Sequence, residues 1–258
     1  MTLPGSVVRF WRALDALFSD VQSTWWGAVV TDGRFPRIWD ANYARVDLPV
    51  EDLGADDVLD ALTPAARAAG ADLLHVVAFH PERHTRLLAE LSTRGHRLAW
   101  DVVLGTARRI DEPDVPVEEL RDDEELWGAV TESFALFGVE PGEAVSQLQT
   151  IEREVLAPGG KRWFGVRDGS GRLVSLGALH QLVGVGYVDN VSTVPGARGR
   201  GYAAAVTARI VREALAAGAT EVFLLADPDD GAVLRLYGRL GFRELGRLAS
   251  TKGVAAPG

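Results

Sequence analysis

Apolar and polar residues follow two different periods along this chain. Where apolar residues recur every three or four positions, the pattern predicts amphipathic helices. In the first part of the chain these helices cover 7–20, 50–70 (as one helix or two) and 82–94. Short runs rich in β-branched and aromatic residues predict strands instead. These strands cover 25–33, 37–49, 73–80 and 97–105.

The second part of the chain has a different order of elements. A polar stretch with prolines at 107–120 is typical of a joint between two units. Two helices are predicted beyond it, and then three successive antiparallel strands, the first two joined by a hairpin turn at 168–171. A long helix, a buried strand, a short helix and a last strand complete the prediction. The ranges are 122–138 and 140–157, then 161–168, 173–182 and 184–194, and finally 202–218, 221–227, 229–240 and 242–250.

Length and internal similarity point to two units. A chain of 258 residues with 47% hydrophobic residues can form one large domain or two small ones with proper cores. The strand, proline-containing turn, helix and strand of 73–104 recur in the same order in 221–250. We therefore expect a duplication, with one unit at 1–106 and a second at 107–258.

Composition narrows the functional class. The net charge of −9 argues against nucleic acid as a main partner. An acidic surface mildly suits cationic or amine substrates, and solubility alone explains it as well. The absence of cysteine excludes disulfides, thiol nucleophiles and cysteine metal sites. The N-terminus lacks the pattern of a signal peptide, and no segment approaches a membrane-spanning length. We expect a cytoplasmic protein, monomeric or homodimeric, with no membrane partner.

The stretch GARGRGYA, residues 196–203, combines flexible and cationic residues at the start of a helix. Gly199 and Gly201 give the backbone freedom and keep side chains away from a ligand. The helix contributes free N–H groups and a partial positive charge, so that with Arg198 and Arg200 the segment suits a phosphate. A simple tight turn explains the same residues equally well. The dinucleotide-binding and P-loop patterns are absent.

Three motifs in sequence order decide between these interpretations. VDNVSTVPGARGRGYA, then EVFLLADP, then LRLYGRLGF resemble the GNAT superfamily of acyl-CoA-dependent N-acyltransferases. Arg198, Gly201 and Ala203 match the loop Arg/Gln-x-x-Gly-x-Gly/Ala of this family. Leu236-Tyr237 and Gly241-Phe242 match its second signature. The resemblance covers the second half and implies an α/β (α+β) fold, with a mixed, mostly antiparallel central sheet flanked by helices.

The resemblance also implies how acetyl-CoA is bound as cosubstrate. The pyrophosphate would lie on backbone N–H groups of the turn, whose residues are Arg198, Gly199, Arg200, Gly201, Tyr202 and Ala203. The pantetheine arm would follow Ser192, Thr193 and Val194. A backbone N–H near Thr193 or Val194 would polarise the thioester carbonyl. No metal is expected.

The family pattern assigns catalytic roles to two side chains. A tyrosine at the place of Tyr237 protonates the departing thiolate, and an aromatic packing role is the alternative. Asp189 is the candidate for accepting the amine proton, directly or through water, and a polar residue at an exposed edge is the equal alternative. His180 is a second candidate base, and Asn190 should face the other side of the strand from Asp189. Trp163 and Glu140 could line the acceptor pocket.

The chain departs from the family pattern at Asp230. The family often has asparagine there, which can donate to the coenzyme, whereas an ionised aspartate can only accept. Asp230 is therefore either a coenzyme contact or the N-cap of the helix that follows it.

The first half lacks the corresponding chemistry. At the helix start equivalent to the turn, carboxylates would repel a pyrophosphate, and Leu91 stands in the place of Tyr237. The acidic residues are Glu51, Asp52, Asp56 and Asp57. We predict a degenerate unit that shapes the acceptor site. We interpret His75, His80, His84 and His96 as structural rather than as metal ligands.

The sequence thus predicts an N-acetyltransferase that moves an acetyl group from acetyl-CoA to an amine by direct attack in a ternary complex. The acceptor is a small-molecule or peptide amine of undefined identity, and a longer acyl donor is an alternative to acetyl. A non-catalytic acyl-CoA-binding or sensing module is the alternative from another class. Tyr237 and Asp189 favour the enzyme.

Overall fold

The structure is a computed structural model that describes residues 3–111 and 114–254. Its backbone contacts divide the chain into Met1–Val103 with Leu245–Gly258, and Leu104–Glu244. Unit 1 and unit 2 denote these two parts. The division near residue 103 lies close to the predicted one at 106, but the C-terminal segment groups with unit 1 and not with unit 2. Residues 112–113 of the predicted joint lie outside the described residues.

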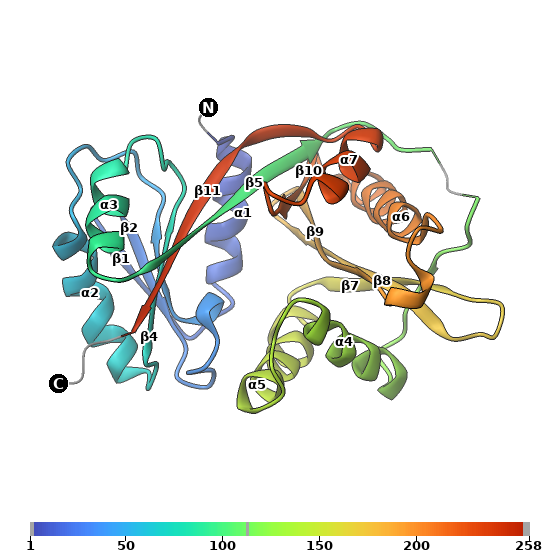
Figure 1. The fold of residues 1–258 in the computed structure, drawn as a ribbon, viewed down its shortest axis with the longest axis horizontal. Helices are drawn as coiled ribbons and strands as arrows, with labels where there is room; N and C mark the ends of the chain where they lie inside the picture. Colours follow the sequence, from blue (N-terminus) through green and yellow to red (C-terminus); the bar gives the residue numbers. More distant parts are fainter. Residues whose placement is uncertain (1–2, 112–113, 255–258) are drawn as a thin grey trace. The chain divides into compact units, whose positions relative to one another are not determined.

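Unit 1 is built on a sheet whose strands follow the order β1-β2-β3-β4-β11. Strand β2 is antiparallel to β1 and β3, β3 is parallel to β4, and β11 is antiparallel to β4, with Ala249 opposite Ala78. The elements are α1 (Gly5–Asp15), β1 (Asp20–Thr24), β2 (Gly27–Thr31), η1 (Trp39–Ala41), β3 (Tyr43–Val46), α2 (Ala55–Ala68), β4 (Leu73–Ala78), α3 (Thr85–Thr93), the first part of β5 (Arg97–Thr106) and most of β11 (Arg243–Val254). Figure 1 shows α2 and α3 beside these strands.

The core of unit 1 joins α2 and α3 to the sheet. Leu62 of α2 and Leu91 of α3 are fully buried in one cluster with Val46 and Val76 of the strands. The helical spacing of the apolar residues in both helices places them on one face, which the sheet covers. These contacts explain why the weakly polar segment 55–68 forms a continuous helix despite Pro64.

Unit 2 contains the sheet β10-β9-β8-β7-β6. Strands β6 to β9 are successive antiparallel neighbours, and β10 is parallel to β9. The elements are β6 (Glu118–Glu119), α4 (Glu124–Leu136), α5 (Glu143–Ile151), the π-helical turn η2 (Glu152–Leu156), β7 (Lys161–Arg167), β8 (Leu173–Leu182), β9 (Val185–Thr193), η3 (Pro195–Ala197), α6 (Tyr202–Ala216), β10 (Glu221–Ala226) and α7 (Gly231–Arg239).

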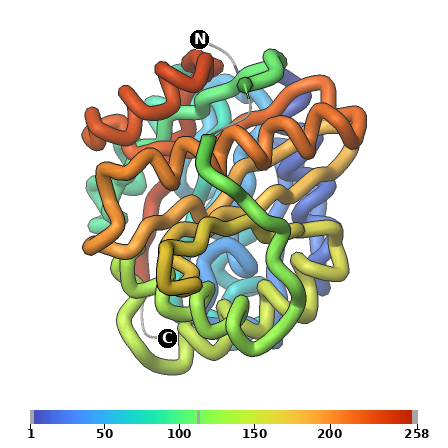
Figure 2. The backbone as a smooth tube through the Cα atoms, turned by 90° about the vertical axis from the view of Figure 1, so that its right-hand side faces the viewer, coloured from blue at the N-terminus to red at the C-terminus, as the bar shows by residue number. Residues whose placement is uncertain are grey.

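Helices cover both faces of the unit 2 sheet. On one face, Trp127 and Phe134 of α4 form a buried cluster with Trp163, Leu176 and Ala178 of the strands. The other face carries α6, whose approach requires small residues: a Cβ at Gly177 would lie 2.9 Å from Val206, and one at Gly186 would lie 2.9 Å from Ala214. Figures 1 and 2 show the α4–α5 segment and α6 on opposite sides of the β7–β8 hairpin. The predicted mixed, mostly antiparallel sheet flanked by helices is confirmed.

Two irregularities of β9 create the site described below. Gly177 alone separates Leu176 from Ala178 on β8, whereas Asn190 and Val191 separate their partners Asp189 and Ser192 on β9. This extra residue is a β-bulge, and Asn190 adopts a φ of 51° within it. The parallel pairing of β9 with β10 covers only Val185–Tyr187. In the described chain, β9 therefore has an open edge beyond Tyr187.

Several element boundaries differ from the sequence prediction. The first helix ends at Asp15 rather than near residue 20, because Asp15 is buried and accepts from the Tyr43 hydroxyl at 2.7 Å. The following residues form β1, an exposed edge strand whose polar residues hid it from the apolar pattern. Within 37–49 only Tyr43–Val46 is a strand. Among the described residues, none of the helices combines the length and apolar character needed to cross a membrane.

Candidate functional site

The glycine–arginine turn joins β9 to α6 through two left-handed backbone positions. Gly199 has a φ of 77° and Gly201, the N-cap of α6, a φ of 80°. A Cβ at either glycine would meet no neighbouring atom within 4 Å. Glycine is therefore required here by backbone conformation and not by lack of space. Arg198 supports the turn through its Nε, which donates to the Thr193 carbonyl at 3.2 Å.

Backbone donors of this turn are available to a ligand. The first helical hydrogen bond runs from the Ala205 N–H to the Gly201 carbonyl, at 3.0 Å. No protein acceptor is found in the described chain for the N–H groups from Gly199 to Ala203. Gly199, Arg200 and Gly201 are exposed residues. The turn therefore fits an anion such as a pyrophosphate, with the helix N-terminus behind it.

Where β9 ends and the turn begins, the N–H groups of Thr193 and Val194 point to opposite edges of the strand. The Val194 N–H donates to the Val174 carbonyl of β8 at 3.0 Å and is therefore occupied. Consecutive N–H groups of a strand alternate in direction, so that of Thr193 points toward the open edge of β9. Of the two predicted donors to a thioester carbonyl, Thr193 is the one left available. The Thr193 and Ser175 hydroxyls are 2.9 Å apart, and the Ser175 hydroxyl also donates to the Ser192 carbonyl at 2.9 Å.

Asp189 lies at the bulge of β9 and is not isolated. Its Oδ2 is 2.7 Å from the Nζ of Lys161 on β7, and the same Nζ is 2.7 Å from Oε1 of Glu152 in η2. The Asn190 side chain also reaches Glu152 Oε1, at 3.3 Å. Asn190 was expected to face the other side of the strand from Asp189, and this expectation is wrong. The bulge and the positive φ of Asn190 bring both side chains to the same face.

His180, the second candidate base, lies next to this group in a less accessible position. It is opposite Lys161 in the register of β7 and β8, and it is 2% exposed. Its Nε2 is 3.1 Å from the Gly159 carbonyl. Burial lowers the pKa of His180. The ring is therefore neutral and engaged by the backbone, whereas the Asp189 side chain is 27% exposed.

Tyr237 lies at the end of the second turn of α7 in a buried environment. It is 7% exposed, and its ring lies edge-on to that of Phe242, with the centroids 5.6 Å apart. Burial, with a smaller effect from the negative charge of Asp230, raises the pKa of Tyr237 to about 12. The phenol is therefore fully protonated at neutral pH. No interaction found in the described chain joins Tyr237 to Asp189 or to the turn.

Asp230 is the N-cap of α7. Its Oδ1 accepts from the N–H groups of Ala232 and Val233, each at 3.0 Å. This side chain satisfies two donors that the helix leaves free at its start. Two roles were predicted for Asp230, a coenzyme contact or a helix N-cap. The structure contains the N-cap.

A cavity of about 210 Å³ lies beside the end of β9. Ser192, Val194 and Pro195 line it from β9 and η3, Ser175 and Leu176 line it from β8, and α4 covers it. It is on the same face of the sheet as Asp189, because Leu176 and Ala178 both pack against α4. Trp163 and Glu140 do not line this cavity: Trp163 is buried in the core, and Glu140 is exposed before α5.

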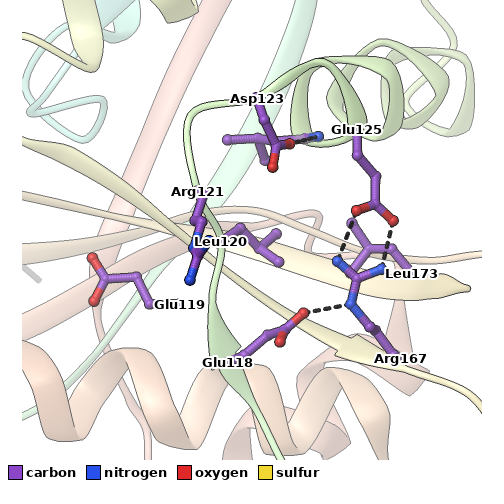
Figure 3. Close-up of a pocket in the computed structure, with 9 residues that line it drawn as sticks. Glu118, Glu119, Leu120, Arg121, Asp123, Glu125, Arg167 and Leu173 are labelled. Carbon is purple, nitrogen blue, oxygen red and sulfur yellow. Dashed lines mark hydrogen bonds and ion pairs between the residues drawn. The ribbon is translucent and has the colours of Figure 1, made fainter. Parts of the chain in front are cut away.

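A second cavity, of about 270 Å³, is lined by carboxylates of β6 and α4. Figure 3 shows Arg167 on one side of it, where the guanidinium contacts Glu118 and Glu125. Arg121 is a second guanidinium of the lining; of the remaining carboxylates, Asp123 accepts from the Leu126 N–H and Glu119 pairs with Arg162. The cavity contains none of the residues predicted for catalysis or coenzyme binding.

The corresponding positions of unit 1 are occupied by the protein itself. At the start of α2, the Gly54 N–H donates to Asp57 and the Ala55 N–H donates to Glu90, both at 2.8 Å. Leu91, in the place of Tyr237, is fully buried in the core. These contacts leave little room for an anion at this helix start. Within the described residues, no three potential ligands converge on a metal position.

Lys161 and Glu152 are site residues that sequence reasoning missed. Both have side chains at most 6% exposed. A lysine at the start of a predicted strand and a glutamate in a predicted helix resemble ordinary surface residues. The one local signal is the π-helical turn, which departs from the α-helical period and is frequent at functional sites.

Comparison with protein families gives one match. Residues 118–242 match the model of the family described as "Acetyltransferase (GNAT) family". This range contains β9, the glycine–arginine turn and the whole of α7. A comparison with curated protein sequences finds no match.

Solved structures resemble the chain in fold at low identity. A GCN5-related N-acetyltransferase from Kribbella flavida has 17% identity and a TM-score of 0.73, with 99% of this chain and 97% of that chain covered. A functionally unknown conserved protein from Staphylococcus epidermidis has 11% identity and a TM-score of 0.71, covering 93% and 95%. A GNAT-family structure from Novosphingobium aromaticivorans has 24% identity and a TM-score of 0.46, covering 62% and 66%. The first two extend over both units, so that unit 1 also shares the fold of these proteins.

Proposed function

We propose that the protein is an acyl-CoA-dependent N-acyltransferase that transfers acetyl from acetyl-CoA to an amine, a proposal supported by the match of residues 118–242 to the model of the acetyltransferase (GNAT) family. The observation that carries the proposal is the turn at Arg198–Ala203, where unpaired backbone N–H groups and left-handed glycines adjoin the open edge of β9. The proposal retains the expectation of a cytoplasmic enzyme, monomeric or homodimeric, with unit 1 as a non-catalytic partner.

In this proposal the backbone of unit 2 binds acetyl-CoA. The pyrophosphate is held by the N–H groups from Gly199 to Ala203, and the pantetheine arm lies along Ser192–Val194 at the open edge. The Thr193 N–H polarises the thioester carbonyl. Asp230, as a helix cap, has no direct part in this proposal.

The reaction is a direct attack within a ternary complex. Asp189 accepts a proton from the ammonium form of the acceptor, directly or through water, and the neutral amine then attacks the carbonyl carbon. The amide bond forms as the C–S bond breaks, and Tyr237 donates its proton to the departing thiolate. Its raised pKa suits an acid that must remain protonated until that step. The cavity beside Ser192 and Ser175 is the proposed acceptor pocket.

The decisive experiment measures free-thiol release from acetyl-CoA against a panel of amines. The panel contains phenethylamine, spermidine, alaninamide and an aminoglycoside, so that each class of acceptor is represented. We expect one class to accelerate thiol release, and Tyr237→Phe to lower kcat on the order of 10²–10⁴-fold without changing acetyl-CoA binding. Phenylalanine keeps the contact with Phe242 and removes only the donor.

Two outcomes contradict the proposal in different ways. If acetyl-CoA binds but no amine accelerates thiol release, the protein is an acyl-CoA-binding module and not a transferase. If Tyr237→Phe turns over as fast as the wild type, the acid is another group or water. Calorimetric titration with acetyl-CoA separates both outcomes from loss of coenzyme binding.

A further inference from the structure

A buried ammonium group lies between two carboxylates on the sheet face that also carries the proposed acceptor pocket. Lys161 Nζ is 2.7 Å from Glu152 Oε1 and 2.7 Å from Asp189 Oδ2. The exposed fractions of the side chains are 0% for Lys161, 6% for Glu152 and 27% for Asp189. Glu152, Lys161 and Asp189 form a row of three charged groups. Its inner end, Glu152, is buried, and its outer end, Asp189, is partly exposed and accessible to a ligand.

The position of Lys161 is costly unless both carboxylates are charged. A buried ammonium loses its hydration, and only paired and hydrogen-bonded charges compensate for that loss. Burial disfavours the charged lysine, yet the attraction of Asp189 and Glu152 leaves the pKa of Lys161 raised. The Nζ also lies 5.1 Å from the centroid of the Trp163 ring, which adds a cation–π contact. The lysine is therefore a fixed positive charge.

Glu152 competes with Asp189 for this charge. Its Oε1 accepts hydrogen bonds from Lys161 Nζ and from Asn190 Nδ2, while Oε2 is buried without a hydrogen-bond partner in the described chain. Burial raises the pKa of Glu152, and the negative charge of Asp189 adds to this effect against the attraction of Lys161. His180 is the other titratable group facing the row, and it is held neutral by its burial. Asp189 thus depends on a cation that it shares.

We propose that Lys161 is a positioning residue for catalysis, which holds the Asp189 carboxylate in place through an ion pair, and that Glu152 moderates this effect by sharing the ammonium. The inference rests on the proposed function, in which Asp189 accepts the proton of the amine. An opposite charge beside a carboxylate favours its ionised form, so removal of that charge is measurable by titration and in the pH dependence of the rate. Lys161 does not touch the reacting atoms.

The test is a direct titration of Asp189. The protein is labelled with ¹³C at the aspartate side-chain carboxyl carbon, and the Asp189 resonance is assigned by its loss in Asp189→Asn. In Lys161→Met the carboxylate loses its opposite charge, so its titration midpoint should rise by about one to three pH units. In Glu152→Gln the competing negative charge is lost while the lysine remains. The midpoint should then fall.

Two further variants control for folding and for general effects of charge. The double variant Lys161→Met with Glu152→Gln removes both buried charges together, which avoids an unpaired buried carboxylate and preserves the fold. Its Asp189 midpoint should also lie above that of the wild type. Arg167→Met is the matched control, because Arg167 is on the same strand and also bridges two carboxylates, but at the separate cavity of Figure 3. Arg167→Met should leave the titration midpoint of Asp189 unchanged.

The pH dependence of kcat/KM with the best amine of the panel supplies the second measurement. Its acid limb should move up in Lys161→Met and down in Glu152→Gln, whereas a merely structural lysine would lower the rate equally at every pH. An Asp189 midpoint that stays unchanged in both Lys161 variants would overturn the role of Lys161. A midpoint that moves as expected, with turnover unaffected by Asp189→Asn, would instead contradict the role of Asp189 in the proposed function.

Discussion

Gly201 shows how one residue can determine coenzyme binding through the backbone. Its φ of 80° places it in the left-handed region, while a Cβ would meet no atom within 4 Å. Gly201→Val should therefore weaken acetyl-CoA binding by about tenfold or more, because left-handed strain costs about 1–2 kcal/mol and is larger for a β-branched residue. Isothermal titration with acetyl-CoA measures the loss.

Two variants separate the backbone of the turn from its charge. Gly201→Asn adds a side chain that tolerates the left-handed conformation, so it should retain most of the affinity. Arg200→Ala removes an exposed guanidinium and should weaken binding less than Gly201→Val. An Arg200→Ala loss larger than that of Gly201→Val would mean that the pyrophosphate is held mainly by side-chain charge.

At the scale of single elements, α7 depends on its cap. Asp230→Ala removes the acceptor for the Ala232 and Val233 N–H groups and should lower the free energy of unfolding by about 1 kcal/mol. Asp230→Asn retains a good cap and should change stability by only a few tenths of a kcal/mol. Urea denaturation measures both. If Asp230 contacted the coenzyme instead, Asp230→Ala would weaken acetyl-CoA binding more than it destabilises the fold.

Local sequence patterns predict the elements of unit 2 well, because they depend on short-range rules. The apolar runs that form β8 and β9 and the amphipathic α6 were all predicted close to their observed positions. The same rules predicted the turn residues as a group, since glycine freedom and a helix start are local properties. β1 was missed because its polar residues lie on an exposed edge, where burial imposes no alternation.

Long-range contacts account for what the sequence could not predict. Nothing local indicates that Lys161 is buried, because its burial depends on Glu152 and Asp189 meeting it from other elements. The common orientation of Asp189 and Asn190 results from a bulge, which depends on the register of two strands. The choice between Thr193 and Val194 as available donor likewise required knowledge of the pairing with β8.

At the scale of the whole molecule, the chain returns at its end to the unit in which it began. Residues 249–254 of β11 pair with β4, and Ala249 and Thr251 are fully buried there. The last strand is therefore part of the core of unit 1, although the catalytic motifs precede it by only a few residues. Loss of the C-terminal segment should damage unit 1 before it affects the turn at Arg198–Ala203.

The contact between Gly253 and His96 allows this dependence to be measured within unit 1. A Cβ at Gly253 would lie 2.5 Å from the imidazole of His96, which is itself 7% exposed. Gly253→Ala should therefore destabilise the protein by about 1–3 kcal/mol through overpacking. His96→Ala removes the obstructing ring, so the double variant should be more stable than the sum of the single effects predicts.

Urea denaturation supplies the free energies, and hydrogen exchange of β4 amides, opposite β11, locates the change. Strictly additive effects would show that the backbone at Gly253 moves away freely, and β11 would then be only loosely held against its neighbours.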